Sequence, residues 1–234
     1  MPSSRPDSIP AIVSLVRQMD PASILDVGVG FGKWGVLFRE YTDIVKSEAE
    51  PQRYDKARWR VRIDGIEGFE PYLTPLHRFA YDQIFVGDAR RVLPTLGRYD
   101  VIFLGDVIEH FTPGDGRALL REALDHAARY VLVSTPRYET EQPASCGNEL
   151  ERHRSLWTGS DFRALDAVDL FAGAGEVLLA VYRRGGAKPV RPRASRRPAW
   201  WYRAGLPLAQ RVLPASVRAR LRLGLDRILR GRDQ

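Results

Sequence analysis

The fold of this chain is decided by one stretch, Ile24-Leu25-Asp26-Val27-Gly28-Val29-Gly30-Phe31-Gly32-Lys33-Trp34-Gly35. The residues up to Val27 have the apolar, β-branched character of a buried parallel strand. From Lys33 to about Ile44, apolar residues recur at helical spacing. The glycines between these segments allow a tight turn and let a ligand touch the backbone, which a Cβ would hinder. The amides at the helix start then face that ligand, so the stretch predicts a nucleotide-handling turn.

The glycine spacing separates two classes of site. A dinucleotide site has G-x-G-x-x-G, with pyrophosphate at the helix N-terminus. Here Gly28, Gly30 and Gly32 give G-x-G-x-G, and Asp26 lies two positions before the first glycine. This pattern resembles the first motif of class I S-adenosylmethionine-dependent methyltransferases. The resemblance implies that the turn passes under the methionine part of the cofactor and that Asp26 orients its amino group, directly or through water.

Composition limits the other possibilities. A chain of 234 residues with 44% hydrophobic residues can bury one full core. Its single cysteine, Cys146, excludes a disulfide framework and fits a reducing compartment. We find neither a signal peptide nor the roughly 20 consecutive apolar residues of a spanning helix. We therefore expect a cytoplasmic protein.

Acidic residues follow the next two predicted strands. In doubly wound folds, a carboxylate at the end of strand two accepts hydrogen bonds from ribose hydroxyls. Glu67 holds that place in the strand predicted over residues 59–69, and Glu70 is the alternative. After the third strand, the resemblance assigns Asp88 to the adenine amino group and the Ala89 amide to a ring nitrogen. Asp88 is also suited to cap the next helix, and the two roles are compatible.

The fourth predicted strand, residues 99–104, runs into Gly105-Asp106-Val107-Ile108-Glu109-His110-Phe111. Ligands in open α/β sheets bind at the carboxyl ends of strands, so these polar residues face the cleft. The run resembles the family's motif after strand four. The resemblance implies that Asp106 lies near the transferred methyl group and that Glu109 and His110 lie beside the cofactor.

The segment 136–157 has no regular pattern and is rich in polar residues. Long irregular segments inside compact domains tend to be functional, so we interpret it as a lid that binds the methyl acceptor. Its run Gly147-Asn148-Glu149-Leu150-Glu151-Arg152-His153-Arg154-Ser155 and the Gly32-Lys33-Trp34-Gly35 segment are similar to a bacterial methyltransferase group associated with surface-polysaccharide and glycolipid biosynthesis. The similarity covers about residues 10–182 and implies a saccharide or glycolipid acceptor.

Two short strands close the predicted domain, over residues 167–171 and 176–182. A terminal hairpin with an antiparallel strand seven is what the methyltransferase fold adds to a doubly wound sheet. We therefore predict that residues 1–184 form an α/β domain, with a doubly wound, seven-stranded, Rossmann-like methyltransferase sheet.

The C-terminal part differs in charge and composition. From residue 187 to 234 the chain has 13 Lys and Arg against two Asp, a net charge of +11, whereas the whole chain carries +7, so residues 1–186 carry −4. We predict a linker over 185–199 and a basic amphipathic helical tail over 200–234, which begins with Trp200-Trp201-Tyr202. Such segments lie in membrane interfaces, so we expect contact with an anionic membrane surface at its inner face. Docking on protein and binding to nucleic acid are the alternatives.

These motifs predict a methyltransferase that uses S-adenosyl-L-methionine to O-methylate a sugar hydroxyl by in-line displacement. The hydroxyl must lose a proton, and His153 in the lid is the favoured base, with His110 as the alternative. Asp106, Glu109, His110, Glu149 and His153 could approach one another around a cation, but nothing in their spacing requires a metal, and we expect none.

Two other functions compete with this prediction. One is a nucleic-acid or other small-molecule methyltransferase, and the other is a cofactor-binding protein without activity. The acidic body disfavours nucleic acid, as does the lack of an Asn-Pro-Pro-Tyr-type site or a catalytic Pro-Cys pair. The acceptor, its methylated position and the oligomeric state stay open at this stage.

Overall fold

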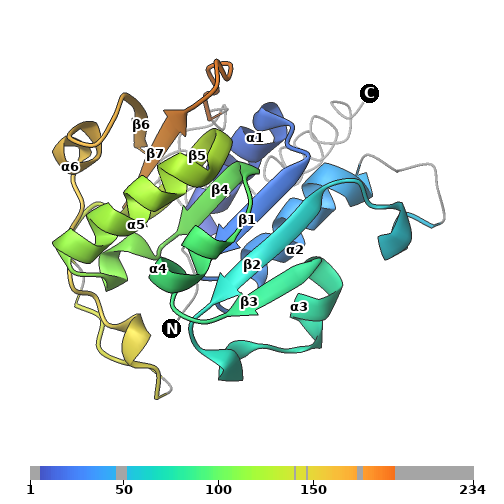
Figure 1. The fold of residues 1–234 in the computed structure, drawn as a ribbon, viewed down its shortest axis with the longest axis horizontal. Coiled ribbons are helices and arrows are strands. Elements are labelled where there is room, and N and C mark those ends of the chain that lie inside the picture. Colours follow the sequence, from blue (N-terminus) through green and yellow to red (C-terminus); the bar gives the residue numbers. More distant parts are fainter. Residues whose placement is uncertain (1–5, 46–51, 140, 146, 173–175, 193–234) are drawn as a thin grey trace, which may run out of the picture. The chain divides into compact units, whose positions relative to one another are not determined.

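Seven strands form one mixed sheet in the order β3-β2-β1-β4-β5-β7-β6 (Figure 1). The computed structural model describes residues 6–45, 52–139, 141–145, 147–172 and 176–192. The parallel strands are β1 (Ser23–Val27), β2 (Arg62–Glu67), β3 (Gln83–Val86), β4 (Tyr99–Gly105) and β5 (Ala127–Pro136). β7 (Val177–Arg183) is antiparallel to both β5 and β6 (Val168–Ala172). The predicted doubly wound, seven-stranded sheet with an antiparallel strand seven is therefore confirmed.

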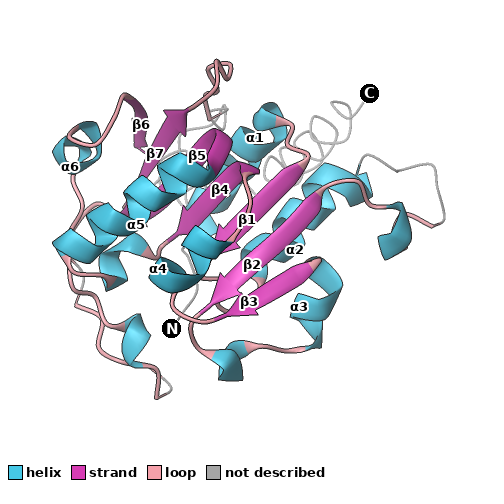
Figure 2. Ribbon diagram, viewed as in Figure 1, coloured by secondary structure: helices cyan, strands magenta, loops and turns pink. Residues whose placement is uncertain are grey.

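Helices cover both faces of the sheet (Figure 2). One face packs against α1 (Ile9–Met19), α2 (Lys33–Arg39) and α3 (Pro75–Ala80), and the other against α4 (Ala89–Val92), α5 (Pro113–His126) and α6 (Gly159–Arg163). A π-helical turn, Glu40–Ile44, continues α2, so the helical segment ends at Ile44 as predicted. Short 3₁₀ turns lie at Pro6–Ser8, Lys56–Arg58, Glu70–Tyr72, Leu93–Thr95, Ile108–His110 and Glu149–Glu151.

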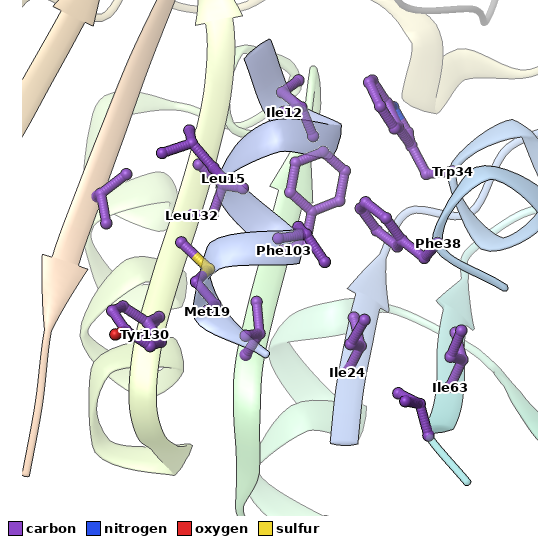
Figure 3. Close-up of a cluster of buried hydrophobic side chains, with 14 of the residues drawn as sticks. Ile12, Leu15, Met19, Ile24, Trp34, Phe38, Ile63, Phe103, Tyr130 and Leu132 are labelled. Atoms are coloured by element: carbon purple, nitrogen blue, oxygen red, sulfur yellow. The ribbon is translucent and has the colours of Figure 1, made fainter. Parts of the chain in front are cut away.

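Alternation along the central strands creates two hydrophobic layers. Ile24 and Phe103 belong to the core beneath α1 and α2, whereas Leu25 and Leu104 belong to the core beneath α5. Figure 3 shows the first layer, where the Phe103 ring lies between α1 and the aromatic side chains of α2. Its ring centroid is 5.2 Å from that of Trp34 in an edge contact. Such alternation places every second residue of β1 on the same face.

Side chains set the starts of β2 and α3. β2 starts at Arg62 and not at Trp59, because the Asp43 carboxylate accepts the backbone amide of Arg60 (2.9 Å) in place of a neighbouring strand. α3 starts at Pro75, where Thr74 and His77 form a reciprocal capping box.

The predicted linker begins with residues that pack on the domain. Val190 is buried in the core beneath α1, and the Tyr130 hydroxyl donates to the backbone oxygen of Lys188 (2.8 Å). The compact unit correspondingly extends to Arg193. Residues 193–234 lie outside the described residues, so the basic amphipathic tail stays a prediction. Across the described ranges, we find no helix with the length and apolar character that crossing a membrane would require.

The aromatic layer generates a stability prediction. Phe103 is fully buried, so replacing it with alanine leaves a cavity between α2 and the sheet. We expect Phe103→Ala to lower the free energy of unfolding by about 3 to 5 kcal/mol in urea denaturation. Tyr54→Ala, at a side chain that is 61% exposed, is the control and should change it by no more than about 0.5 kcal/mol. Equal losses in the two variants would contradict the assignment of Phe103 to the core.

Candidate functional site

The carboxyl ends of β1, β2 and β4 open into a cavity of about 620 Å³. This volume lies in the usual range for small-molecule sites. The cavity wall brings together most of the predicted site residues, namely Gly28, Gly30, Glu67, Asp88, Ala89, Asp106, His110 and His153. Asp26 and Gly32 lie outside that wall. The lid contributes Asn148, Leu150 and Glu151, so donor-side and acceptor-side predictions meet in one cavity.

The glycine turn has a backbone that only glycine adopts without strain. Gly28, Gly30 and Gly32 all have positive φ angles, of 76°, 54° and 83°. A Cβ on Gly28 would lie 2.5 Å from Cγ2 of Val107. The amides of Gly28 and Val29 donate to the backbone oxygen of Ile66, at 2.8 and 3.1 Å. The turn is thus tied to the end of β2, and its backbone forms part of the cavity wall.

Glu67 connects the turn to β2 through its carboxylate. Its Oε2 accepts the Gly30 amide at 2.8 Å, and its Oε1 accepts the Phe69 amide at 2.8 Å. Burial raises the pKa of this carboxyl group above its usual value, while the two amides act in the opposite direction. Each carboxylate oxygen has a second lone pair, so Glu67 has capacity for two hydroxyl donors from the cavity.

Asp26 supports the turn from the side of the sheet. Since β1 alternates, its fully buried side chain points toward α3, where the Tyr81 hydroxyl donates to Oδ2 at 2.6 Å. The same hydroxyl accepts the Gly35 amide at 3.0 Å. Burial raises the pKa of Asp26 to about 7. Asp26 lies outside the cavity wall, so its predicted contact with a cofactor amino group stays a prediction.

His77 supports the glycine turn and is not among the residues that the sequence motifs identify. Its Nδ1 accepts the Thr74 amide at 3.0 Å, so Nε2 carries the proton and donates to the Gly30 backbone oxygen at 2.9 Å. His77 and Tyr81 are four residues apart and follow one helical face. That spacing, behind a glycine turn, is the signal that could have identified both residues.

Asp88 caps α4, as its position indicates. Its Oδ1 accepts the Arg90 amide at 2.9 Å, and the carboxylate pairs with the Arg90 guanidinium at 2.6 Å. Hydrogen bonds from Arg90 lower the pKa of Asp88. The capping role is confirmed, and because Asp88 and Ala89 also line the cavity, the predicted adenine contact is compatible with it.

The motif after β4 contributes two acidic side chains to the cavity wall. Asp106 has a left-handed backbone, with φ of 54°, and its Oδ1 accepts the Ser134 hydroxyl at 3.2 Å. Glu109 is only 2% exposed, and its Oε2 accepts the Thr135 hydroxyl at 3.1 Å. Burial raises the pKa of Glu109 well above its usual value, and the Asp106 carboxylate adds to this. Its Oε1 has no partner in the described part of the chain.

The lid docks on this motif and brings two histidines together. The backbone oxygen of Glu109 accepts the Arg154 amide at 2.8 Å, and the His110 and His153 ring centroids are 4.9 Å apart. Burial, with a smaller effect of His153, lowers the pKa of His110 to about 4, so its imidazole is neutral at pH 7. Glu149, the remaining member of the predicted polar cluster, is exposed and pairs with Arg152.

Comparison with known proteins shows similarity at the level of the fold. No family model matches the chain, and no curated protein matches its sequence. The N-terminal domain of EvdMO1, solved in the presence of SAH and D-fucose, aligns with a TM-score of 0.52 and 17% identity, covering 77% of this chain and 84% of that one. An O-methyltransferase family protein from Burkholderia thailandensis gives a TM-score of 0.51 and 14% identity, over 76% and 56% of the two chains.

A third solved structure, the mitomycin 7-O-methyltransferase MmcR, gives a TM-score of 0.51 and 17% identity, over 76% of this chain and 53% of that one. At such identities the likeness establishes the fold alone. Together with the strand order, it shows that this chain has the class I methyltransferase fold.

The buried Asp26 carboxyl group generates a pH prediction. Its pKa is about 7 in the folded chain and about 4 when unfolded, so between these values the folded state binds more protons. Its contribution to the free energy of unfolding therefore falls as pH rises from 4 to 7, by at most about 4 kcal/mol. We expect urea denaturation to show that the free energy of unfolding of wild type, relative to that of Asp26→Asn, falls as pH rises from 4 to 7. The exposed-site control Asp125→Asn should follow wild type, and a constant offset for Asp26→Asn would contradict the assignment.

Proposed function

We propose that this protein is an S-adenosylmethionine-dependent methyltransferase. The observation that carries the proposal is the single cavity that the glycine turn shares with Glu67, Asp88, Asp106 and the lid. The class I methyltransferase fold supports it, as do the fold neighbours solved with bound SAH. A cofactor with an adenine ring, a ribose diol and a sulfonium group matches the order of the polar groups along this wall.

In this proposal each part of the cofactor has a partner. The methionine end lies along the glycine turn, Glu67 accepts the ribose hydroxyls, and the adenine ring lies near Asp88 and Ala89. Asp106 then lies near the sulfonium centre, where its negative charge favours the cation. The cofactor has no phosphate, so the helix that begins at Lys33 does not have to bind one. This agrees with the G-x-G-x-G spacing, which differs from that of a dinucleotide site.

The acceptor we propose is a hydroxyl group of a saccharide or glycolipid. Supporting this class, the lid lines the cavity with polar side chains, and one fold neighbour was solved in the presence of D-fucose. The acceptor oxygen attacks the methyl carbon in line, the C–S bond breaks, and a neutral thioether leaves. His153 is the favoured base for the hydroxyl proton, with His110 as the alternative.

Cofactor binding gives the first test of this function. Hydrogen bonds to a charged acceptor contribute about 1.5 to 3 kcal/mol, so we expect Glu67→Gln to weaken SAH binding by roughly 10- to 100-fold in isothermal titration calorimetry. Glu70→Gln is the matched control, because this exposed residue was the alternative ribose ligand. Equal loss in the two variants, or no SAH binding by wild type, would argue against the proposed cofactor site.

The acceptor class is tested in a strain that lacks the gene. Mass spectrometry of its surface glycans and glycolipids should show a component that is one methyl group lighter than in the parent strain. The wild-type gene should restore that methyl group and the Glu67→Gln gene should not. If every glycan and glycolipid keeps its methyl groups while SAH binding is intact, the saccharide acceptor is wrong and the methyltransferase assignment stands.

A further inference from the structure

We infer that Glu109, His110 and His153 bind a divalent first-row transition-metal ion at the acceptor end of the cavity. The three residues come from two segments, the 3₁₀ turn Ile108–His110 after β4 and the lid. One ligand atom from each residue lies within 4.8 Å of the other two. In the described residues, this is the group of His, Cys, Asp and Glu side chains whose geometry suits an ion.

The separation of these atoms is close to what an ion requires. Metal–nitrogen and metal–oxygen bonds are about 2.1 Å, so two ligands of one tetrahedral ion are about 3.4 Å apart. The longest separation in the cluster, 4.8 Å, therefore has to shorten by up to roughly 1.4 Å. Both histidines are partly exposed, and a small side-chain rotation supplies this movement.

An unsatisfied carboxylate oxygen is the second, independent observation. Glu109 is 2% exposed and lines the cavity, yet its Oε1 has no hydrogen-bond partner in the described part of the chain. A buried acceptor left unpaired costs about 1 to 3 kcal/mol, and more when it is charged. A cation coordinated by Oε1 removes that cost.

Neighbouring groups orient two of the three ligands, Glu109 and His110, as in known metal sites. The Thr135 hydroxyl holds the other Glu109 oxygen, Oε2, at 3.1 Å. The Arg152 backbone oxygen lies 3.3 Å from Nδ1 of His110, where it can accept a ring N–H. Second contacts of this kind fix the rotamer and tautomer of metal ligands.

The donor set selects a class of ion. Two imidazoles and one carboxylate suit Mn²⁺, Fe²⁺, Co²⁺ or Zn²⁺, whereas Mg²⁺ and Ca²⁺ prefer sites made entirely of oxygen ligands. Three protein ligands also leave coordination positions open for a substrate oxygen. This inference revises the expectation, drawn from residue spacing alone, that the site holds no metal.

The role of the ion rests on the proposed methyl transfer. Coordination of the acceptor hydroxyl lowers its pKa, so its proton leaves to solvent water and the oxygen attacks the methyl carbon. The new C–O bond forms as the C–S bond breaks, and sulfur keeps the electron pair as a neutral thioether. In this inference the His110 and His153 imidazoles hold and orient the ion, and neither of them takes the acceptor proton.

Binding of Mn²⁺ to the full-length chain is the direct test, because loss of the free Mn²⁺ signal in electron paramagnetic resonance reports binding without any turnover. We expect one tight Mn²⁺ per chain, with excess Mg²⁺ as a weak competitor. Glu109→Gln and His153→Asn should each weaken binding by at least roughly tenfold. His126→Asn, at a histidine on α5 outside the cavity, is the matched control and should bind like wild type.

The outcome separates this inference from the proposed function. If Mn²⁺ does not bind, or binds equally to wild type and His153→Asn, the metal site is wrong, and SAH binding is unaffected by that result. If Glu109→Gln fails to fold, His153→Asn carries the test, because its side chain lies in the partly exposed lid. Tight Mn²⁺ binding without SAH binding would keep the metal site and overturn the methyltransferase proposal.

Discussion

The hydrogen bond from the Gly30 amide to the Glu67 carboxylate is the contact on which the rest of the site depends. It joins the turn after β1 to the end of β2, and the same glycine is held from the other side by His77 of α3. Beneath them, Tyr81 links Asp26 of β1 to the start of α2. Because these contacts fix the turn before a ligand arrives, binding loses little conformational entropy in ordering it.

The far end of the cavity is built by a different constraint, the docking of the lid on the backbone of Glu109. The strand order places the motif after β4 in the middle of the sheet, next to the turn after β1. One segment of the lid then crosses over this motif, so that His153 meets His110. The rigid turn, which we assign to the donor, and the lid, which we assign to the acceptor, thus face one cavity.

Much of this arrangement was predictable from local patterns. Apolar segments that end in or run into glycine or an acid predicted β1, β2 and β4, and the closing hairpin predicted the antiparallel β7. Contacts between distant segments were not predictable in the same way. His77 and Tyr81 look like ordinary helix residues until α3 is placed beside the glycine turn, and His153 lies 43 positions after His110 in the chain. Their meeting depends on the path of an irregular segment, which no periodicity encodes.

The central claim is that the cavity at the ends of β1, β2 and β4 holds S-adenosylmethionine. A crystal structure of the full chain with SAH tests it most directly. We predict that the ribose hydroxyls lie on the Glu67 carboxylate, that the amino-acid end follows Gly28 and Gly30, and that the sulfur faces Asp106 and the two histidines. SAH bound elsewhere, or its adenosine at the histidine end of the cavity, would contradict the account.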